Sequence, residues 1–139
     1  MGKINLGRVI LGGLLAGLVI NTSEFILNGL ILGRQLEDAM RAMNRPPIGN
    51  EAISYFVIGG FILGILLIWL YAAIRPRFRP GPQTAICAGL AVWALAYFYS
   101  SLGFIAMGLF PTSVMVIGLV WGIVELPVAA VAGASVYKE

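Results

Sequence analysis

Residues 52–74 read AISYFVIGGFILGILLIWLYAAI, and none of them carries a charge. A membrane-crossing helix needs about 20 consecutive, mostly apolar residues, so this run is long enough to span a bilayer. Three further runs of similar character lie at residues 9–33, 84–110 and 112–137. We therefore expect an all-α fold, an integral membrane four-helix bundle with up-and-down topology.

The composition of the whole chain supports this class. Hydrophobic residues make up 60% of the 139 residues, charged residues make up 11%, and the mean hydropathy is +0.95. Soluble domains are about half apolar and a quarter charged. The runs also lack the alternating pattern of membrane barrel strands. We expect residues 1–139 to form a single four-span transmembrane domain, with no separate soluble domain and no nucleic-acid partner.

The positive charges gather on one side of the expected bundle. An even number of spans places both termini on the same side, together with the second connection. That side carries Lys3, Arg8, Arg75, Arg77, Arg79 and Lys138. The opposite side carries Arg34, Arg41 and Arg45, offset by Glu37, Asp38 and Glu51. The positive-inside rule then predicts that both termini lie in the cytoplasm. We expect the membrane to be a bacterial cytoplasmic membrane.

The first connection has an amphipathic pattern over residues 35–43, which ends before the Asn-Arg-Pro-Pro sequence at 44–47. This pattern predicts a short amphipathic helix after span one, lying at the outer membrane interface. The alternative is that span one protrudes from the membrane by two turns.

The second connection, residues 75–82, contains three prolines and three arginines. Arg75, Arg77 and Arg79 would lie at headgroup level and could contact anionic lipid headgroups, an acidic loop of a partner or an anionic substrate. Alternatively, they only set the topology.

Small residues four apart recur along the spans, as in the pairs Gly13 with Gly17, Gly60 with Gly64, Gly118 with Gly122, and Ala129 with Gly133. Such pairs allow helix backbones to approach closely in lipid. We expect them to hold the bundle together rather than to mark a dimer interface.

The unusual chemistry of the chain lies in two glutamates within the spans. A carboxyl group at this depth is costly and is a functional-site hypothesis by default. In span one, Asn21, Glu24 and Asn28 follow helical spacing and share one face. In span four, Glu125 follows Trp121 by one turn and precedes Pro127 by two residues.

The two glutamates lie at similar depth, within about 5 Å along the membrane normal at ~1.5 Å per residue. Spans one and four are neighbours in an up-and-down bundle, so both carboxyl groups could face one proton or ligand site, with Tyr97 and Trp121 as its walls. The spans contain no basic side chain, so the expected counter-ion is a proton, a cation or an arginine of a partner. Alternatively, each glutamate simply ties two helices together.

The sequence offers no cofactor or catalytic machinery. It has no histidine, and Cys87 is its only cysteine, so we expect no intrachain disulfide, no metal site and no cofactor. No phosphate-binding, zinc-protease or nucleophile-elbow motif is present, and we expect a non-enzymatic protein with no catalytic residues.

The leading hypothesis is an accessory or assembly subunit that acts through helix contacts, either with other membrane subunits or by self-association. The alternative is a proton-coupled carrier of a cationic or amphipathic small molecule, using Glu24 and Glu125. In size, number of spans and the glutamate in span one, the chain is similar to the small multidrug resistance carriers. Its long first loop and second glutamate depart from that pattern, so the likeness is architectural only.

Overall fold

The computed structural model describes residues 2–139, and within this range the regular structure is entirely helical. Helix α1 (Leu6–Glu24) continues into the π-helical segment η1 (Phe25–Ile31). The short α2 (Gly33–Ala42) and the long α3 (Asn50–Phe78) follow. Next, α4 (Pro82–Val92), the π-helical η2 (Trp93–Phe98) and α5 (Tyr99–Met107) form one continuous helix, and α6 (Thr112–Ser135) ends the chain.

Four of these helices are long and apolar enough to cross a membrane. They cover Leu6–Ile31, Asn50–Phe78, Pro82–Met107 and Thr112–Ser135. The four predicted spans are confirmed as helices, and their ends differ from the prediction by a few residues.

The expected short helix after span one is also present. The chain bends at Leu32, whose φ of −99° and ψ of 5° depart from helical values. This bend separates α2 from η1, so span one does not continue as a straight protruding helix. Ala39 is buried on one side of α2, whereas Glu37, Asp38 and Arg41 are exposed on the other.

The second connection is shorter than predicted, because α3 runs through Pro76 to Phe78. Residue 76 is a proline, so it cannot donate the backbone hydrogen bond to residue 72 that the helix would otherwise make. The turn begins at Arg79, with a φ of 74°. The buried Thr84 hydroxyl holds this turn, because it donates to the carbonyl of Arg79 at 2.6 Å and lies 3.1 Å from the carbonyl of Phe78.

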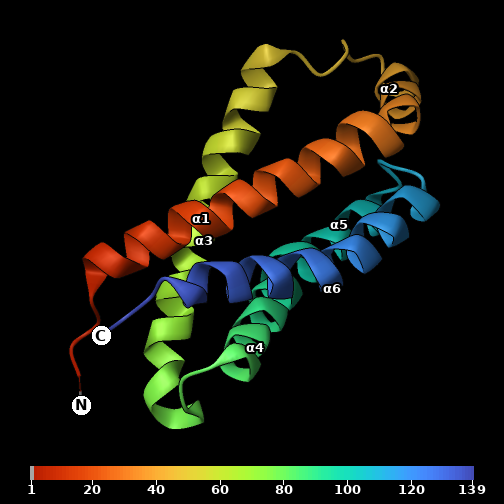
Figure 1. The fold of residues 1–139 in the computed structure, drawn as a ribbon. Helices are drawn as coiled ribbons and strands as arrows, with labels where there is room; N and C mark the ends of the chain where they lie inside the picture. The colour runs from red at the N-terminus through yellow and green to blue at the C-terminus, as the bar shows by residue number, and fades with distance from the viewer. Residues whose placement is uncertain (1) are drawn as a thin grey trace.

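Figure 1 shows α1 crossing α3, while α6 runs beside α1 and back toward the N-terminus. The backbones of α1 and α3 meet where Gly64 faces Gly13 and Gly17, and a Cβ on Gly64 would overlap backbone atoms of both glycines. The predicted role of these small residues in packing the bundle is confirmed here. Gly118 is different, because a Cβ at this position would meet open space.

The main core lies in the part of the molecule nearest the two termini. Its fully buried members come from all four long helices and include Ala16, Leu67, Ile68, Ala88, Leu126 and Ala129. Beyond the crossing of α1 and α3, every residue at 50–59 and 99–107 is exposed or only partly buried. The α3 helix therefore leaves the bundle beyond its crossing with α1, whereas η1 and α6 stay packed there through a second, smaller core of Leu27, Leu32 and Val114.

Candidate polar site between the helices

Glu125 of α6 is the most buried charged residue in the described chain, with 4% of its surface exposed. Both of its carboxyl oxygens accept hydrogen bonds from other helices. The Tyr97 hydroxyl donates to Oε1 at 2.6 Å, and the Ser23 hydroxyl donates to Oε2 at 2.5 Å. Glu125 therefore joins α1, η2 and α6 at a single point.

Glu24 of α1 belongs to the same group of side chains. Its Oε2 atom accepts a hydrogen bond of 2.5 Å from the Asn28 side-chain amide, and its Oε1 atom lies 3.4 Å from the Tyr97 hydroxyl. The hydroxyl of Tyr97 thus contacts the carboxyl groups of both glutamates. The expectation that Glu24 and Glu125 face one site agrees with this geometry.

Trp121 closes the group on the side of α6. Its indole Nε1 donates to the Ser23 hydroxyl at 2.7 Å, and that hydroxyl in turn donates to Glu125. Ser23 was not among the predicted site residues. The signal that could have revealed it is its spacing from Ile20 and Leu27, both buried, which places Ser23 on the inward face of its helix.

Two of the three helices are irregular where they reach this group. Glu24 is the last residue of α1 before η1 begins, and Tyr97 lies within η2. Segments of π-helix are rare and are frequently found at functional sites. On α6, Pro127 packs against Gly89 of α4, where a Cβ would overlap the Pro127 backbone. This close approach helps to bring Tyr97 over Gly122, one turn from Glu125.

Asn21 requires a correction. We expected it to share the site with Glu24 and Asn28, but its amide donates to the backbone carbonyl of Val57 at 3.1 Å, on α3. The side chain also lies against Gly60. Asn21 therefore contributes to the contact between α1 and α3.

We call this group the acid cluster (Ser23, Glu24, Asn28, Tyr97, Trp121 and Glu125). The exposure of its side chains increases from Glu125 to Asn28. Glu125 is buried, Glu24 and Tyr97 are partly buried, and Asn28 is exposed. The acid cluster thus forms a continuous polar connection from the core to the outer surface of η1. Within residues 2–139, no three histidine, cysteine or acidic side chains converge as metal ligands would.

The three arginines of the second connection lie apart from the acid cluster and differ from one another. Arg77 and Arg79 are exposed, whereas the Arg75 side chain is only 20% exposed and pairs with Glu139 at 3.4 Å. Comparison with known proteins gives no match to a family model, a curated protein or a solved structure.

Proposed function

We propose that the chain is an integral membrane protein of the bacterial cytoplasmic membrane, with its four long helices arranged up and down and both termini in the cytoplasm. The length and hydropathy of the four helices support insertion. The excess of lysine and arginine near the termini and the second turn supports the orientation. In this placement, α2 lies at the outer interface.

We further propose that the acid cluster exchanges protons for a cationic or amphipathic small molecule, so that the protein is a proton-coupled carrier. The observation that supports this function is the contact of one hydroxyl, that of Tyr97, with the carboxyl groups of both glutamates. We place this hypothesis ahead of the assembly role, because helix contacts alone do not require two carboxyl groups to converge.

The carrier hypothesis is favoured by the number of hydrogens that Tyr97 can donate to the two carboxyl groups. Tyr97 has a single hydroxyl hydrogen, and it donates to Glu125 over the shorter distance. If both carboxyl groups were ionised, Glu24 would face the Tyr97 oxygen with no hydrogen between them, beside a second negative charge. Since the apolar runs at 9–33, 52–74, 84–110 and 112–137 contain no basic side chain, a proton or a bound cation must balance this charge.

Burial suggests separate roles for the two glutamates. Glu125 is enclosed and accepts hydrogen bonds from two hydroxyl groups, so we assign it the uptake and release of a proton inside the bundle. Glu24 is partly exposed and has only the Asn28 amide as a close donor, so we assign it the contact with a cationic substrate. The rings of Tyr97 and Trp121 would add cation–π attraction.

The test is proton release from the purified protein in weakly buffered detergent, with tetraphenylphosphonium as a probe amphipathic cation. Glu24→Gln and Glu125→Gln should each abolish the release, because glutamine keeps the side-chain volume and removes the titrating group. Glu51→Gln is the matched control, since Glu51 is an exposed carboxyl at the start of α3. Release that survives in both cluster variants would refute the carrier.

The second candidate function is an accessory subunit of a membrane complex or a homo-oligomer. The observation that favours it is the position of Asn28 and Glu24 toward the outer surface of the helices, where lipid would not satisfy a polar pair. A partner helix could cover them. Native mass spectrometry of the gently extracted protein would show a stoichiometric complex if this is correct, and Glu24→Gln would then weaken association.

A further inference from the structure

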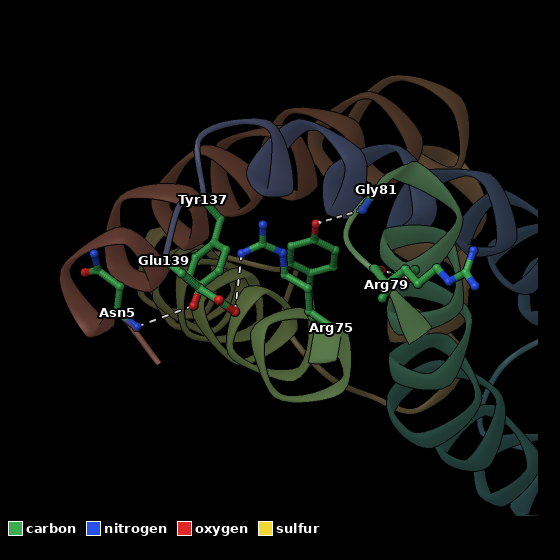
Figure 2. Close-up of polar contacts among 8 residues, drawn as sticks. Asn5, Arg75, Arg79, Gly81, Tyr137 and Glu139 are labelled. Atoms are coloured by element: carbon green, nitrogen blue, oxygen red, sulfur yellow. Dashed lines mark hydrogen bonds and ion pairs between the residues drawn. The ribbon is translucent and has the colours of Figure 1, made fainter. Parts of the chain in front are cut away.

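Arg75 lies in the last turn of α3, and its guanidinium group lies against the ring of Tyr137. Its guanidinium group is 5.4 Å from the centre of the Tyr137 ring, and that ring meets Tyr71 edge to face at 6.0 Å. Figure 2 shows the guanidinium between the C-terminal segment and the turn at Gly81. Tyr137 is itself 5% exposed and accepts a hydrogen bond from the Asn5 backbone at 3.4 Å.

The hydrogen-bond donors of the Arg75 guanidinium group are poorly satisfied at this position. Its Nε and Nη1 atoms are buried and donate no hydrogen bond to any acceptor in the described residues. The ion pair between Nη1 and Glu139 is long, at 3.4 Å, and is not aligned as a hydrogen bond. Buried donors without acceptors are costly and are rare in native proteins, so a better acceptor would be favoured here.

Glu139 is easily displaced. It follows the end of α6, its side chain is 41% exposed, and the segment is anchored independently by Tyr137. The surroundings are strongly basic, since Arg77, Arg79 and Lys138 belong to the same end of the molecule. An incoming anion could therefore replace the Glu139 carboxylate while Tyr137 stays in position.

We propose that Arg75 is the centre of a phosphate-binding site and that Glu139 competes with the phosphate for it. A phosphate group offers several oxygen acceptors to a guanidinium, which is the side chain best suited to bind it. The site lies at one end of the long helices, where an anionic lipid presents its phosphate. A free phosphate has the same chemistry, and the experiment separates the two sources.

The test measures binding to the purified full chain in neutral detergent by native mass spectrometry and by thermal shift. The probes are dioleoyl phosphatidylglycerol, dioleoyl phosphatidylcholine and inorganic phosphate. We expect phosphatidylglycerol to bind better than phosphatidylcholine. Glu139→Gln should increase its affinity several-fold, because the competing charge is gone. Arg75→Gln should abolish the preference, and Arg75→Lys should weaken it. Stabilisation of Glu139→Gln by inorganic phosphate equal to that by phosphatidylglycerol would identify free phosphate as the ligand.

Arg77→Gln and Arg79→Gln are the matched controls, since each removes an exposed positive charge from the same region. The site is absent if they reduce binding as much as Arg75→Gln does, because the attraction is then diffuse. It is also absent if Glu139→Gln leaves the affinity for phosphatidylglycerol and for inorganic phosphate unchanged. Equal binding of the two lipids, together with no stabilisation by inorganic phosphate, would likewise rule it out. If Arg75→Gln fails to fold, the proposal is still tested by comparing the binding of phosphatidylglycerol to Glu139→Gln and to the unmodified chain.

Discussion

The Ser23 hydroxyl donates a hydrogen bond of 2.5 Å to Glu125, although 102 positions separate the two residues in the chain. This bond joins the first and the last long helix inside the bundle. The same hydroxyl accepts the indole hydrogen of Trp121. Ser23 therefore orients the carboxyl group of Glu125 and the ring of Trp121 together.

Ser23→Ala should remove both of these bonds. Glu125 keeps only the Tyr97 donor, and the Trp121 indole loses its acceptor, so we expect the Trp121 fluorescence to shift to shorter wavelength. The measurement uses a background with Trp69→Phe and Trp93→Phe, so that Trp121 alone emits. Ser100→Ala is the control, since Ser100 bonds back to the carbonyl of Ala96 on its own helix and should leave the emission unchanged.

Tyr97→Phe should lower both stability and proton release. The ring stays in place, but the hydroxyl that contacts both carboxyl groups is lost, at a cost of about 1 kcal/mol for a hydrogen bond between membrane helices. Thermal unfolding in detergent and the tetraphenylphosphonium assay measure the two effects. Tyr99→Phe changes an exposed tyrosine two positions away and should alter neither. Equal behaviour of the two variants would argue against a role for the hydroxyl.

The sequence predicted the four long helices, because long runs without charges locate membrane helices. It allowed Glu24 and Glu125 to share one site, since they lie at similar depth on spans expected to be neighbours, but it left open that each glutamate separately ties two helices together. The same reasoning placed Tyr97 and Trp121 beside the glutamates, as the hydrogen bonds of both side chains agree.

The prediction for Asn21 was wrong and other features were missed, because they depend on how each helix is rotated about its own axis. Asn21 has the spacing of a site residue, but the contact of Gly17 and Gly60 across α1 and α3 turns it toward Val57. The segments η1 and η2 change the helical period near the site, and apolar residues give no local signal for this change. The position of Arg75 under Tyr137 was also hidden, because it depends on residues far apart in the chain.

Asn21→Ala should change stability, whereas Asn28→Ala should change proton release. Asn21 bonds across to α3, so its loss should reduce stability and leave proton release intact. Asn28 bonds to Glu24 from an exposed position, so its loss should alter proton release with little effect on stability. The two variants, compared by thermal unfolding and by the tetraphenylphosphonium assay, test whether the site begins at Glu24. A change of proton release in Asn21→Ala would extend the site toward α3.

Gly64→Ala should destabilise the bundle, because the added methyl group overlaps backbone atoms of Gly13 and Gly17. Overpacking of this kind costs about 1–3 kcal/mol. Gly59→Ala is a matched control on the same helix, where a Cβ meets open space. Thermal unfolding of both variants in one detergent gives the comparison, and equal melting temperatures would show that the helices cross elsewhere.

The proposed orientation predicts the labelling of single cysteines in intact cells. In a Cys87→Ser background, the Arg41→Cys variant should react with a membrane-impermeant maleimide added outside the cells. The Lys3→Cys and Lys138→Cys variants should react only after the membrane is permeabilised. Reaction of all three positions from outside, or the reverse pattern, would overturn the assignment of the termini to the cytoplasm.

The glycine contact between α1 and α3 also determines how the molecule can deform. The backbones touch at Gly64, and the two helices stay joined as far as the bond between Asn21 and Val57. If this contact acts as a pivot, Asn50 lies about 10 Å beyond Val57 along α3 at ~1.5 Å per residue, and a tilt of about 10° would carry it through roughly 2 Å. Glu24 and Asn28 follow Asn21 and lie on the open side of the pivot. Small rotations of two rigid helices would therefore open and close the flank on which the acid cluster reaches the surface.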